Sequence, residues 1–455
     1  MSGVDPARRA AFDVLAEVRT EAAYTNLVLP RLLRERGLSG RDARFTTELV
    51  SGTVRMRGLY DAVLTGLVNR PLEQVDPAVL DTLRLGCHQL LSMRVPTHAA
   101  VGTTVDLVRG AVGHRPAGFV NAVLRKVARH DLAGWVRRVA PDPGHDPVGY
   151  AAVAHSHPRW VVEQLQTALG SAGGELEALL AADNAAPRVS LVARPGAATA
   201  EELLAGGAEP GRYSPYAAVL PAGDPGALEA VRSGRAAVQD EGSQLVALAT
   251  AAAGVEGRDA SWLDLCAGPG GKSALLAGLA ADRGAGVLAV ERQPHRARLV
   301  RNATAAVRAG MVGVIAADGR RPAWPAGRFD RALVDAPCTG LGALRRRPEA
   351  RWRRGPDDLA ALVTLQRDLV DAALDSVRPG GIVAYATCSP VLEETSGVVS
   401  AALQGRDDVT LEDASALFPG VPDLHPEQQA VPGTVQLWPH RHGTDAMFFA
   451  LLRRG

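Results

Sequence analysis

The stretch Trp262-Leu263-Asp264-Leu265-Cys266-Ala267-Gly268-Pro269-Gly270-Gly271-Lys272 decides the fold of the C-terminal half of this chain. A short apolar run ends in a turn of small residues, and a helical pattern begins at Lys272 and continues to residue 281. Further apolar runs at 287–290, 312–316, 332–334 and 382–386 alternate with helical patterns at 295–309 and 359–377. This alternation predicts an α/β Rossmann-like domain, a mostly parallel sheet with helices on both faces. We expect a late edge strand at 448–452.

The turn of small residues is typical of a loop whose backbone closely approaches a bound cofactor. A phosphate-binding P-loop needs a glycine six positions before its lysine, where this chain has Cys266. The dinucleotide fingerprint needs a glycine three positions after Gly270 and finds Ser273. The remaining pattern, Asp-x-x-x-Gly-x-Gly-Gly, is that of S-adenosylmethionine sites. The predicted cofactor contacts in the loop are Cys266, Ala267, Gly268, Pro269, Gly270, Gly271 and Lys272.

Two acidic residues at later strand ends complete this predicted site. Glu291 ends the next strand, just over twenty residues past the glycines, and can accept both ribose hydroxyls; its alternative is a solvated helix cap before Pro294. Asp318 follows the third strand and can reach the adenine amino group; its alternative is an ordinary Asp-Gly turn. Lys272 either touches the cofactor carboxylate or merely starts the helix.

Two cysteines each close a different apolar run, in Asp335-Ala336-Pro337-Cys338 and in Tyr385-Ala386-Thr387-Cys388. Parallel sheets hold ligands outside the carboxyl ends of their strands, so the two thiols are expected over one pocket. A buried free cysteine is otherwise only a small hydrophobe. Beside a methyl donor, a thiolate permits another chemistry. Its addition to C6 of a pyrimidine makes C5 nucleophilic enough to take a methyl group.

These motifs resemble the RNA cytosine-5 methyltransferases, in particular the bacterial small-subunit rRNA type known as Sun/RsmB. The resemblance rests on the cofactor loop, on Asp335–Gly342 with the arginines that follow, on Tyr385–Ser389 and on Gly443–Phe449. It covers nearly the whole chain and implies a NusB-like RNA-binding domain at the N-terminus. Gly268 stands where many relatives have Ala, a difference that should be tolerated.

The resemblance also implies roles for individual residues. Cys388 would be the nucleophile, and Cys338 would assist release of the methylated RNA. DNA cytosine-5 enzymes instead attack with the Pro-Cys thiol, which is Cys338 here. Asp335 would bond the cytosine N3/N4 edge and share the cofactor pocket.

The segment Arg345–Arg354 directly follows the Cys338 motif and holds six arginines and a tryptophan. Arginine beside an aromatic ring suits phosphate contact and base stacking. We expect RNA contacts from Arg346, Arg347, Arg351 and Trp352; the alternative is a charged surface turn.

The spacing of apolar residues in the N-terminal third of the chain predicts helices throughout. Residues 1–140 carry 20 Lys and Arg against 13 Asp and Glu, although the whole chain has a net charge of only +1. A basic module indicates a polyanionic partner. Cys87 falls on an apolar helical stripe and is expected to be a core residue. The expected domains are an all-helical NusB-like domain at 1–138, a small α+β linking segment at 148–235, and the methyltransferase domain at 236–455.

The remaining expectations concern the setting and the rival functions. The widely spaced cysteines do not predict a metal site, and no apolar run is long enough to span a membrane. We therefore expect a cytoplasmic protein. We also expect a monomer, and the resemblance implies that it acts on 16S rRNA. The alternatives are the same chemistry on tRNA or another RNA, and a non-catalytic RNA-binding or antitermination factor.

Overall fold

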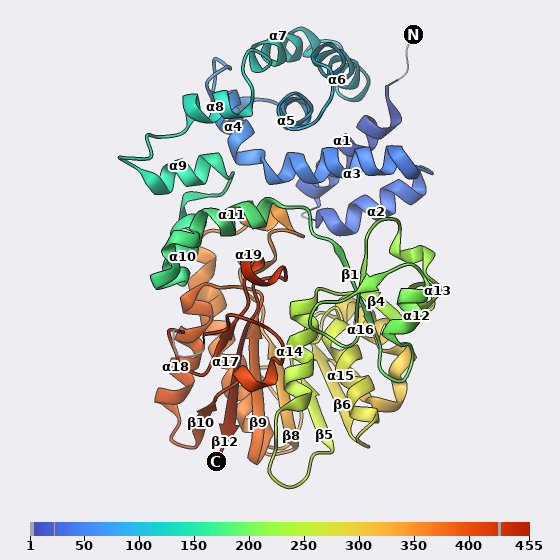
Figure 1. The fold of residues 1–455 in the computed structure, drawn as a ribbon, viewed down its shortest axis with the longest axis vertical. Coiled ribbons are helices and arrows are strands. Elements are labelled where there is room, and N and C mark those ends of the chain that lie inside the picture. The colour runs from blue at the N-terminus through green and yellow to red at the C-terminus, as the bar shows by residue number, and fades with distance from the viewer. Residues whose placement is uncertain (1–3, 22, 426–428) are drawn as a thin grey trace. The chain divides into compact units, whose positions relative to one another are not determined.

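The glycine-rich turn joins the first strand of a large sheet to the helix that covers it. The computed structural model describes residues 4–21, 23–425 and 429–455. The chain forms two compact units, each coloured by sequence position in Figure 1. The first unit, here called the helical unit, comprises residues 1–166, 171–185 and 344–353. The second, the catalytic unit, comprises residues 167–170, 186–343 and 354–455.

This division differs from the expected domain boundaries in two places. Helices α9 to α11, expected in the linking segment, fall almost entirely in the helical unit. Residues 344–353, expected in the methyltransferase domain, also belong to the helical unit.

The first eleven helices build the helical unit. Asp76 caps α5, because its Oδ1 accepts hydrogen bonds from the backbone N–H groups of Ala78 at 2.8 Å and Val79 at 3.2 Å. Along α5, Leu83 and Cys87 are fully buried, so Cys87 is a core residue as expected. The helices are α1 (Pro6–Thr20), α2 (Thr25–Glu35), α3 (Gly40–Arg55), α4 (Arg57–Thr65), α5 (Pro77–Leu91), α6 (Thr97–Ala111), α7 (Ala117–Val127), α8 (Leu132–Val139), α9 (Pro147–Ala154), α10 (Arg159–Leu169) and α11 (Leu176–Asn184).

A small antiparallel sheet opens the catalytic unit. Its strand order is β2-β3-β1-β4, and short helices connect the strands. The elements are β1 (Val189–Ala193), α12 (Ala200–Ala205), β2 (Glu209–Pro210), β3 (Ala217–Leu220), α13 (Glu229–Arg232) and β4 (Ala236–Val238).

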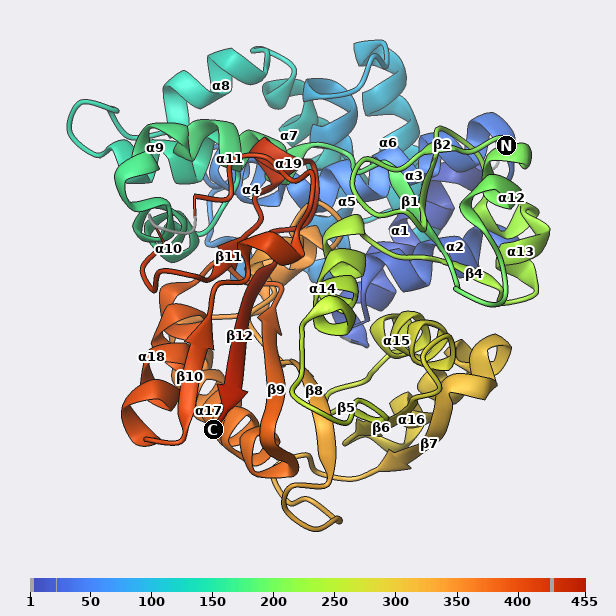
Figure 2. The ribbon, with the colours of Figure 1, turned by 60° about the horizontal axis from the view of Figure 1, so that its bottom comes forward.

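The main sheet has the order β10-β12-β9-β8-β5-β6-β7, with β11 paired to β12, and Figure 2 shows its strands in this sequence. The core strands from β9 to β7 are parallel, whereas β12 and β10 are antiparallel additions. The elements are α14 (Glu241–Ala252), β5 (Ser261–Asp264), α15 (Gly271–Ala281), β6 (Gly286–Glu291), α16 (Pro294–Ala303), β7 (Met311–Ala316), β8 (Phe329–Asp335), α17 (Pro356–Ser376), β9 (Val377–Thr387), α18 (Ser396–Gly405), β10 (Val409–Glu412), β11 (Val435–Gln436), α19 (Pro439–His442) and β12 (Phe448–Arg454).

The sheet confirms the predicted α/β Rossmann-like class. One expectation about it was wrong: β12 is not an edge strand, because β10 pairs along its outer side. The run at 409–412 is short and half polar, so its sequence pattern did not predict the strand that covers β12.

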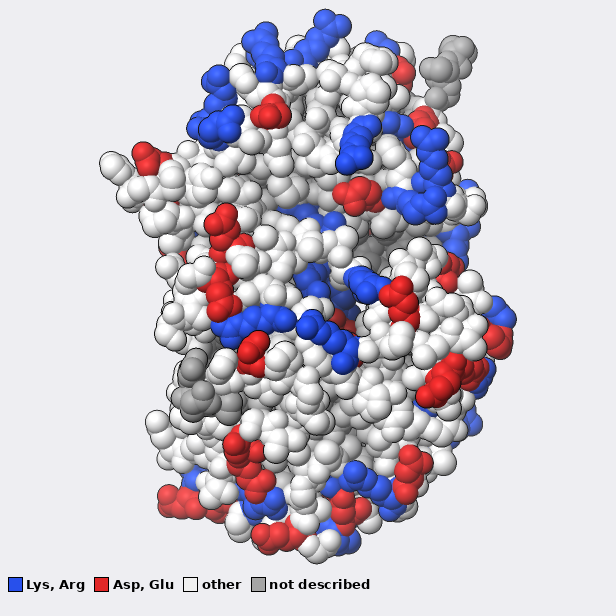
Figure 3. Space-filling view, in the orientation of Figure 1, with Lys and Arg blue, Asp and Glu red and all other residues white. Residues whose placement is uncertain are grey.

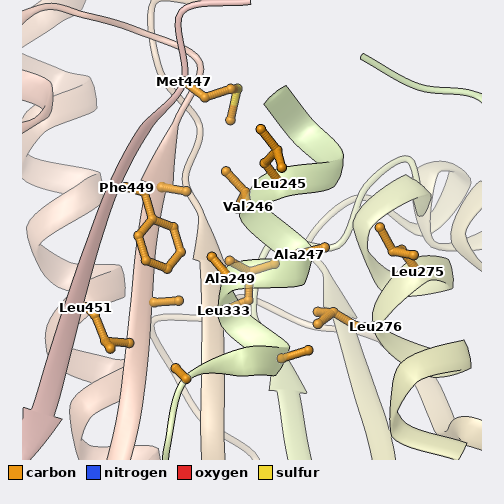
Figure 4. Close-up of a cluster of buried hydrophobic side chains, with 14 of the residues drawn as sticks. Leu245, Val246, Ala247, Ala249, Leu275, Leu276, Leu333, Met447, Phe449 and Leu451 are labelled. Carbon is orange, nitrogen blue, oxygen red and sulfur yellow. The ribbon is translucent and has the colours of Figure 1, made fainter. Parts of the chain in front are cut away.

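Helices cover both faces of the main sheet. Successive strand residues point to opposite faces, so Leu333 packs with α14 and α15 while Val334 packs with α17 and α18. Figure 4 shows the first of these layers, where Leu245 and Val246 of α14 and Leu276 of α15 lie over the strands near Phe449. The sheet is thus buried on both faces, and its strand ends remain for ligands.

Candidate active site

The sheet order brings the carboxyl ends of β5, β6, β8 and β9 to one edge. Strand β5 lies between β6, which is the next strand in sequence, and β8, which comes only after β6 and β7. The connections therefore diverge at β5, and ligands bind at such a switch point in open α/β sheets. Asp335 at the end of β8 pairs in register with Ala386 of β9, two residues before Cys388.

This register places the two predicted thiols together. The Sγ atoms of Cys338 and Cys388 lie 3.5 Å apart, and both residues are partly exposed. The hydrogen bond to Cys388 and burial raise the pKa of the Cys338 thiol well above its usual value, and the charges of Cys388, Glu394 and Asp335 act in the same direction. The raised pKa keeps Cys338 a thiol, which can donate a hydrogen bond to the sulfur of Cys388.

A buried carboxylate that the sequence did not single out joins the two cysteine loops. Glu394 ends a short 3₁₀ turn (Leu392–Glu394) and is fully buried. Its Oε1 accepts a hydrogen bond from the backbone N–H of Thr339 at 2.8 Å, and its Oε2 accepts one from the Thr339 hydroxyl at 2.5 Å. The Thr339 hydroxyl also lies 3.1 Å from Ser389 Oγ, next to Cys388.

A glycine provides a second link between these loops. The backbone N–H of Gly342 donates to the carbonyl of Cys388 at 2.9 Å, and the carbonyl of Gly342 accepts from Ala446 N–H at 2.8 Å. A Cβ at position 342 would stand 2.2 Å from the Ala446 carbonyl oxygen and 2.9 Å from that of Cys388. Only glycine allows this approach.

The cofactor loop has the backbone geometry that its sequence predicts. Gly270 adopts φ +111°, a left-handed conformation that favours glycine, and it caps α15. Ala267 is tied to the next strand by a 2.8 Å bond from its N–H to the Val290 carbonyl. Pro269 is exposed, and Cys266, Gly268, Gly271 and Lys272 are partly exposed. The first turn of α15 thus has backbone N–H groups available for an anionic ligand.

Glu291 lies directly over this loop. It is only 5% exposed, so it is not a solvated helix cap. Its Oε1 accepts from Gln293 N–H at 2.9 Å, and Arg296 Nη1 lies 3.6 Å from its Oε2. A Cβ at Gly268 would stand 2.0 Å from Oε2, so alanine at this position is tolerated only if the carboxylate moves.

Three other acidic residues lie at the strand ends. Asp264 is buried, its Oδ2 accepts from Ser273 Oγ at 2.5 Å, and burial raises its pKa to about 7. Lys272 Nζ donates to Asp335 Oδ2 at 2.7 Å, a pairing that neither of the two expectations for Lys272 included. The side chain of Asp318 pairs with Arg320 at 2.7 Å, and this hydrogen bond lowers the pKa of Asp318 to about 2.

The arginine-rich segment differs from its prediction. Arg351 is fully buried, and its Nη1 donates to the Ser156 carbonyl at 3.0 Å and to Asn184 Oδ1 at 2.8 Å. Its assignment as an RNA contact is therefore wrong, because the guanidinium is used inside the helical unit. Burial also lowers the pKa of Arg351 to about 10.

The neighbours of Arg351 are anchored in the same unit. Glu349 is buried and accepts from Thr25 N–H at 3.0 Å and Thr25 Oγ1 at 3.1 Å. Trp352 packs so closely that a Cβ at Gly58 would stand 2.5 Å from its ring, which leaves no base-stacking face on that side. Arg347 is half-buried and lies over the Tyr24 ring at 5.1 Å. Arg346 is half-buried too, and its expected RNA contact stays a prediction.

The described residues form neither a metal site nor a membrane-spanning helix. No group of three or more His, Cys, Asp or Glu residues in the described part of the chain is arranged to hold a metal ion. None of the helices at 4–21, 23–425 and 429–455 has the length and hydropathy needed to cross a membrane.

The chain is similar to known proteins over nearly its whole length. The family model described as 16S rRNA methyltransferase RsmB/F matches residues 254–453, and the NusB family model matches residues 5–129. The ribosomal RNA small subunit methyltransferase B of Pseudomonas putida is 34% identical over 98% of each chain. The chain belongs to the RsmB/F methyltransferase family. It is accordingly an S-adenosylmethionine-dependent methyltransferase with a NusB-type helical domain.

Two further proteins are similar to this chain over nearly its whole length. A Mycobacterium tuberculosis protein named as a methyltransferase, Rv1407, is 56% identical over 99% of this chain and 97% of its own. The crystal structure of PH0851 has the same fold, with a TM-score of 0.80 and 22% identity over 99% of both chains. The RsmB/F fold expected from the sequence is therefore confirmed.

Proposed function

We propose that this enzyme transfers a methyl group from S-adenosylmethionine to C5 of a cytosine in 16S rRNA, through a covalent bond between Cys388 and C6. One observation carries the proposal: two thiols 3.5 Å apart stand beside a glycine-lined cofactor loop at the switch point of the sheet. A methyl transfer to an oxygen or nitrogen atom needs no such thiol pair.

The residues at the strand ends suit S-adenosylmethionine. The glycine loop from Cys266 to Gly271 leaves backbone accessible to a ligand, because Pro269 is exposed and Gly268 and Gly271 are partly exposed. Glu291 would accept the ribose hydroxyls, and Asp318 and Lys272 would border the rest of the ligand. When bound, the cofactor supplies an electrophilic sulfonium methyl group.

The first half of the reaction uses Cys388. Its thiolate adds to C6 of the cytosine, the C6–S bond forms, and the π electrons of C5=C6 move to C5. That carbon becomes nucleophilic and gains the methyl group, which leaves C5 with both a methyl group and its original proton. The Asp335 carboxylate, partly exposed and held by Lys272, accepts a hydrogen bond from the N4 amino group and orients the ring.

The second half uses Cys338. The hydrogen bond and charge of Cys388 contribute to the raised pKa of Cys338. Both disappear when Cys388 becomes a thioether, so Cys338 can then lose its proton to water and act as a base. It takes the C5 proton, the C5=C6 bond forms again, and the C6–S electron pair returns to Cys388 as a thiolate. The enzyme ends with one thiol and one thiolate, as it began.

Two observations support an RNA substrate. The matching family and relatives are named for small-subunit rRNA. On α7 and the turn after it, Arg125, Lys126 and Arg129 are exposed, and the described residues provide no carboxylate partner for them. Figure 3 shows Lys and Arg side chains in groups on the surface of the helical unit. Such cations bind phosphates in a salt-dependent manner. Arg346 and Arg347 are proposed as a second phosphate contact.

The test separates the roles of the two thiols. Purified protein is incubated with a 16S rRNA transcript and labelled S-adenosylmethionine, and covalent protein–RNA adducts are resolved on a denaturing gel. Cys388→Ala should lose both turnover and adduct, whereas Cys338→Ala should lose turnover and accumulate adduct. The reverse pattern would assign the attack to Cys338. Methylation of a tRNA transcript but not of 16S rRNA would overturn the substrate.

A further inference from the structure

The carboxylate of Glu394 is buried beside the loop that carries Cys338, because it accepts two hydrogen bonds from Thr339. It is fully buried, yet no Lys or Arg donates to it in the described hydrogen bonds and ion pairs. A buried carboxylate is costly unless several hydrogen bonds compensate it. Its partners are the N–H and hydroxyl of Thr339 and the Nε2 of Gln366 at 3.0 Å.

These partners come from three separate segments around the thiol pair. Thr339 follows Cys338 directly. Gln366 belongs to α17, and its Nε2 also donates to the Pro337 carbonyl at 2.8 Å, on the other side of Cys338. The hydroxyl of Tyr385 on β9 donates to the main-chain carbonyl of Glu394 at 2.5 Å. Glu394 therefore holds Thr339 directly and Pro337 through Gln366, and its own carbonyl is bonded to the strand that ends next to Cys388.

We propose that Glu394 is a positioning residue that fixes the Cys338 loop against Cys388 and thereby controls breakdown of the covalent RNA adduct. The inference rests on the proposed function, since it concerns the step assigned there to Cys338. Glu394 itself touches neither thiol in the described hydrogen bonds and acts through Thr339.

Electrostatics support the same role. The negative charge of Glu394 contributes to the raised pKa of Cys338, together with Cys388 and Asp335. Tyr385 and Cys266 are further titratable groups nearby, and Lys272 pairs with Asp335. A higher pKa makes the Cys338 thiolate a stronger base for the C5 proton. Removing the charge of Glu394 should lower this pKa and weaken the base.

The main test uses Glu394→Gln, which can keep the bond pattern without the charge. The amide oxygen can accept from Thr339 N–H and Gln366, and the amide NH₂ can donate to the Thr339 hydroxyl, which then turns toward Ser389. We expect adduct to form at the wild-type rate and to break down more slowly. The rate of adduct breakdown should rise with pH as Cys338 loses its proton. This rise should occur at lower pH in Glu394→Gln, because the pKa of Cys338 is lower. Glu394→Ala, which also frees the loop, should slow breakdown about 100-fold.

Two measurements keep formation and breakdown separate. RNA in which 5-fluorocytidine replaces cytidine has no C5 proton to remove, so the trapped adduct reports formation alone. Unmodified 16S rRNA transcript with labelled S-adenosylmethionine reports turnover. The matched control is Glu393→Gln, because Glu393 is the exposed neighbour. It should behave as wild type in both assays, and thermal melting checks that all variants are folded.

The outcomes are distinct. Wild-type breakdown in both Glu394 variants would overturn the inference, as would an equal loss of formation and breakdown in folded Glu394→Gln. A rise of the breakdown rate at the same pH as in wild type would remove the role of the charge. If Cys338→Ala also forms no adduct, the proposed covalent function itself fails, whereas adduct in Cys338→Ala alone would overturn only the role of Glu394.

Discussion

The cofactor loop and the arginine-rich segment were both predicted to bind ligands, but they differ in exposure: the loop is accessible, whereas much of the segment is buried. In the loop at 266–272 the small residues leave backbone exposed at a strand end. In the segment at 344–353, three charged residues, Arg345, Glu349 and Arg351, are buried in the helical unit. The spacing of glycines specifies a backbone shape directly. A run of arginines specifies only charge. Whether these arginines contact RNA or other parts of the protein depends on residues far away in the sequence.

The largest expected effect is that of Arg351→Ala, which tests whether the arginine-rich segment is buried. The change removes a buried guanidinium that satisfies the carbonyl of Ser156 and the amide oxygen of Asn184. Breaking such a buried arrangement should lower the free energy of unfolding of the helical unit by about 3–5 kcal/mol. Denaturant unfolding measures it. Arg354→Ala is the control, since Arg354 is exposed and should change stability by about 0.5 kcal/mol or less. Equal effects of the two would place the segment at the surface.

The burial of Asp264, just before the cofactor loop, should make the free energy of unfolding depend on pH. Asp264 has a pKa of about 7 in the folded protein, above the ordinary value of 3.8. The folded state then holds a proton that the unfolded chain releases, so stability falls as pH rises from about 4 to 7. Asp264→Asn removes this dependence. Its stability relative to wild type should rise by about 2–3 kcal/mol between pH 5 and pH 8. A constant difference across these pH values would contradict the burial of this carboxylate.

Two glycines in the loop should differ in a measurable way. Gly270→Ala places a Cβ 2.9 Å from the Val300 backbone at φ +111°, so we expect a strain of about 1–2 kcal/mol and weaker binding of S-adenosylmethionine. Gly268→Ala meets only the end of the Glu291 side chain, which can turn aside. Its loss of affinity, measured by calorimetry, should be smaller. A larger loss in Gly268→Ala would mean that the Glu291 carboxylate is fixed and essential.

The smallest expected effect is a change in the salt dependence of RNA binding, which distinguishes the two proposed phosphate contacts. Replacing Arg125, Lys126 and Arg129 by Ala should reduce the slope of log affinity for RNA against log salt by about 2, at roughly 0.7 per lost phosphate contact. Replacing Arg346 and Arg347 should change it by less, because Arg347 already lies over Tyr24. If only the second pair alters the slope, RNA contacts the arginine-rich segment after all.

The sequence predicted those parts of the molecule that depend on local backbone pattern. Alternating strands and helices gave the sheet, and the motifs at Cys338 and Cys388 gave a thiol pair that the strand register places at 3.5 Å. It did not predict contacts between distant segments. Nothing local in Glu394 shows that it binds Thr339, 55 residues away in the chain. The strand at 409–412 and the pairing of Lys272 with Asp335 were also missed, because each depends on tertiary neighbours.

The place of residues 344–353 within the helical unit also has a consequence for synthesis. A ribosome makes residues 1–185 first and reaches Arg351 only after some 165 more residues, which takes roughly 10–30 s at bacterial rates. During that interval the hydrogen-bond partners of Thr25 and Asn184, which are Glu349 and Arg351, have not yet been synthesised. The first unit to emerge is thus among the last to be finished, and its maturation is timed by translation of the catalytic half.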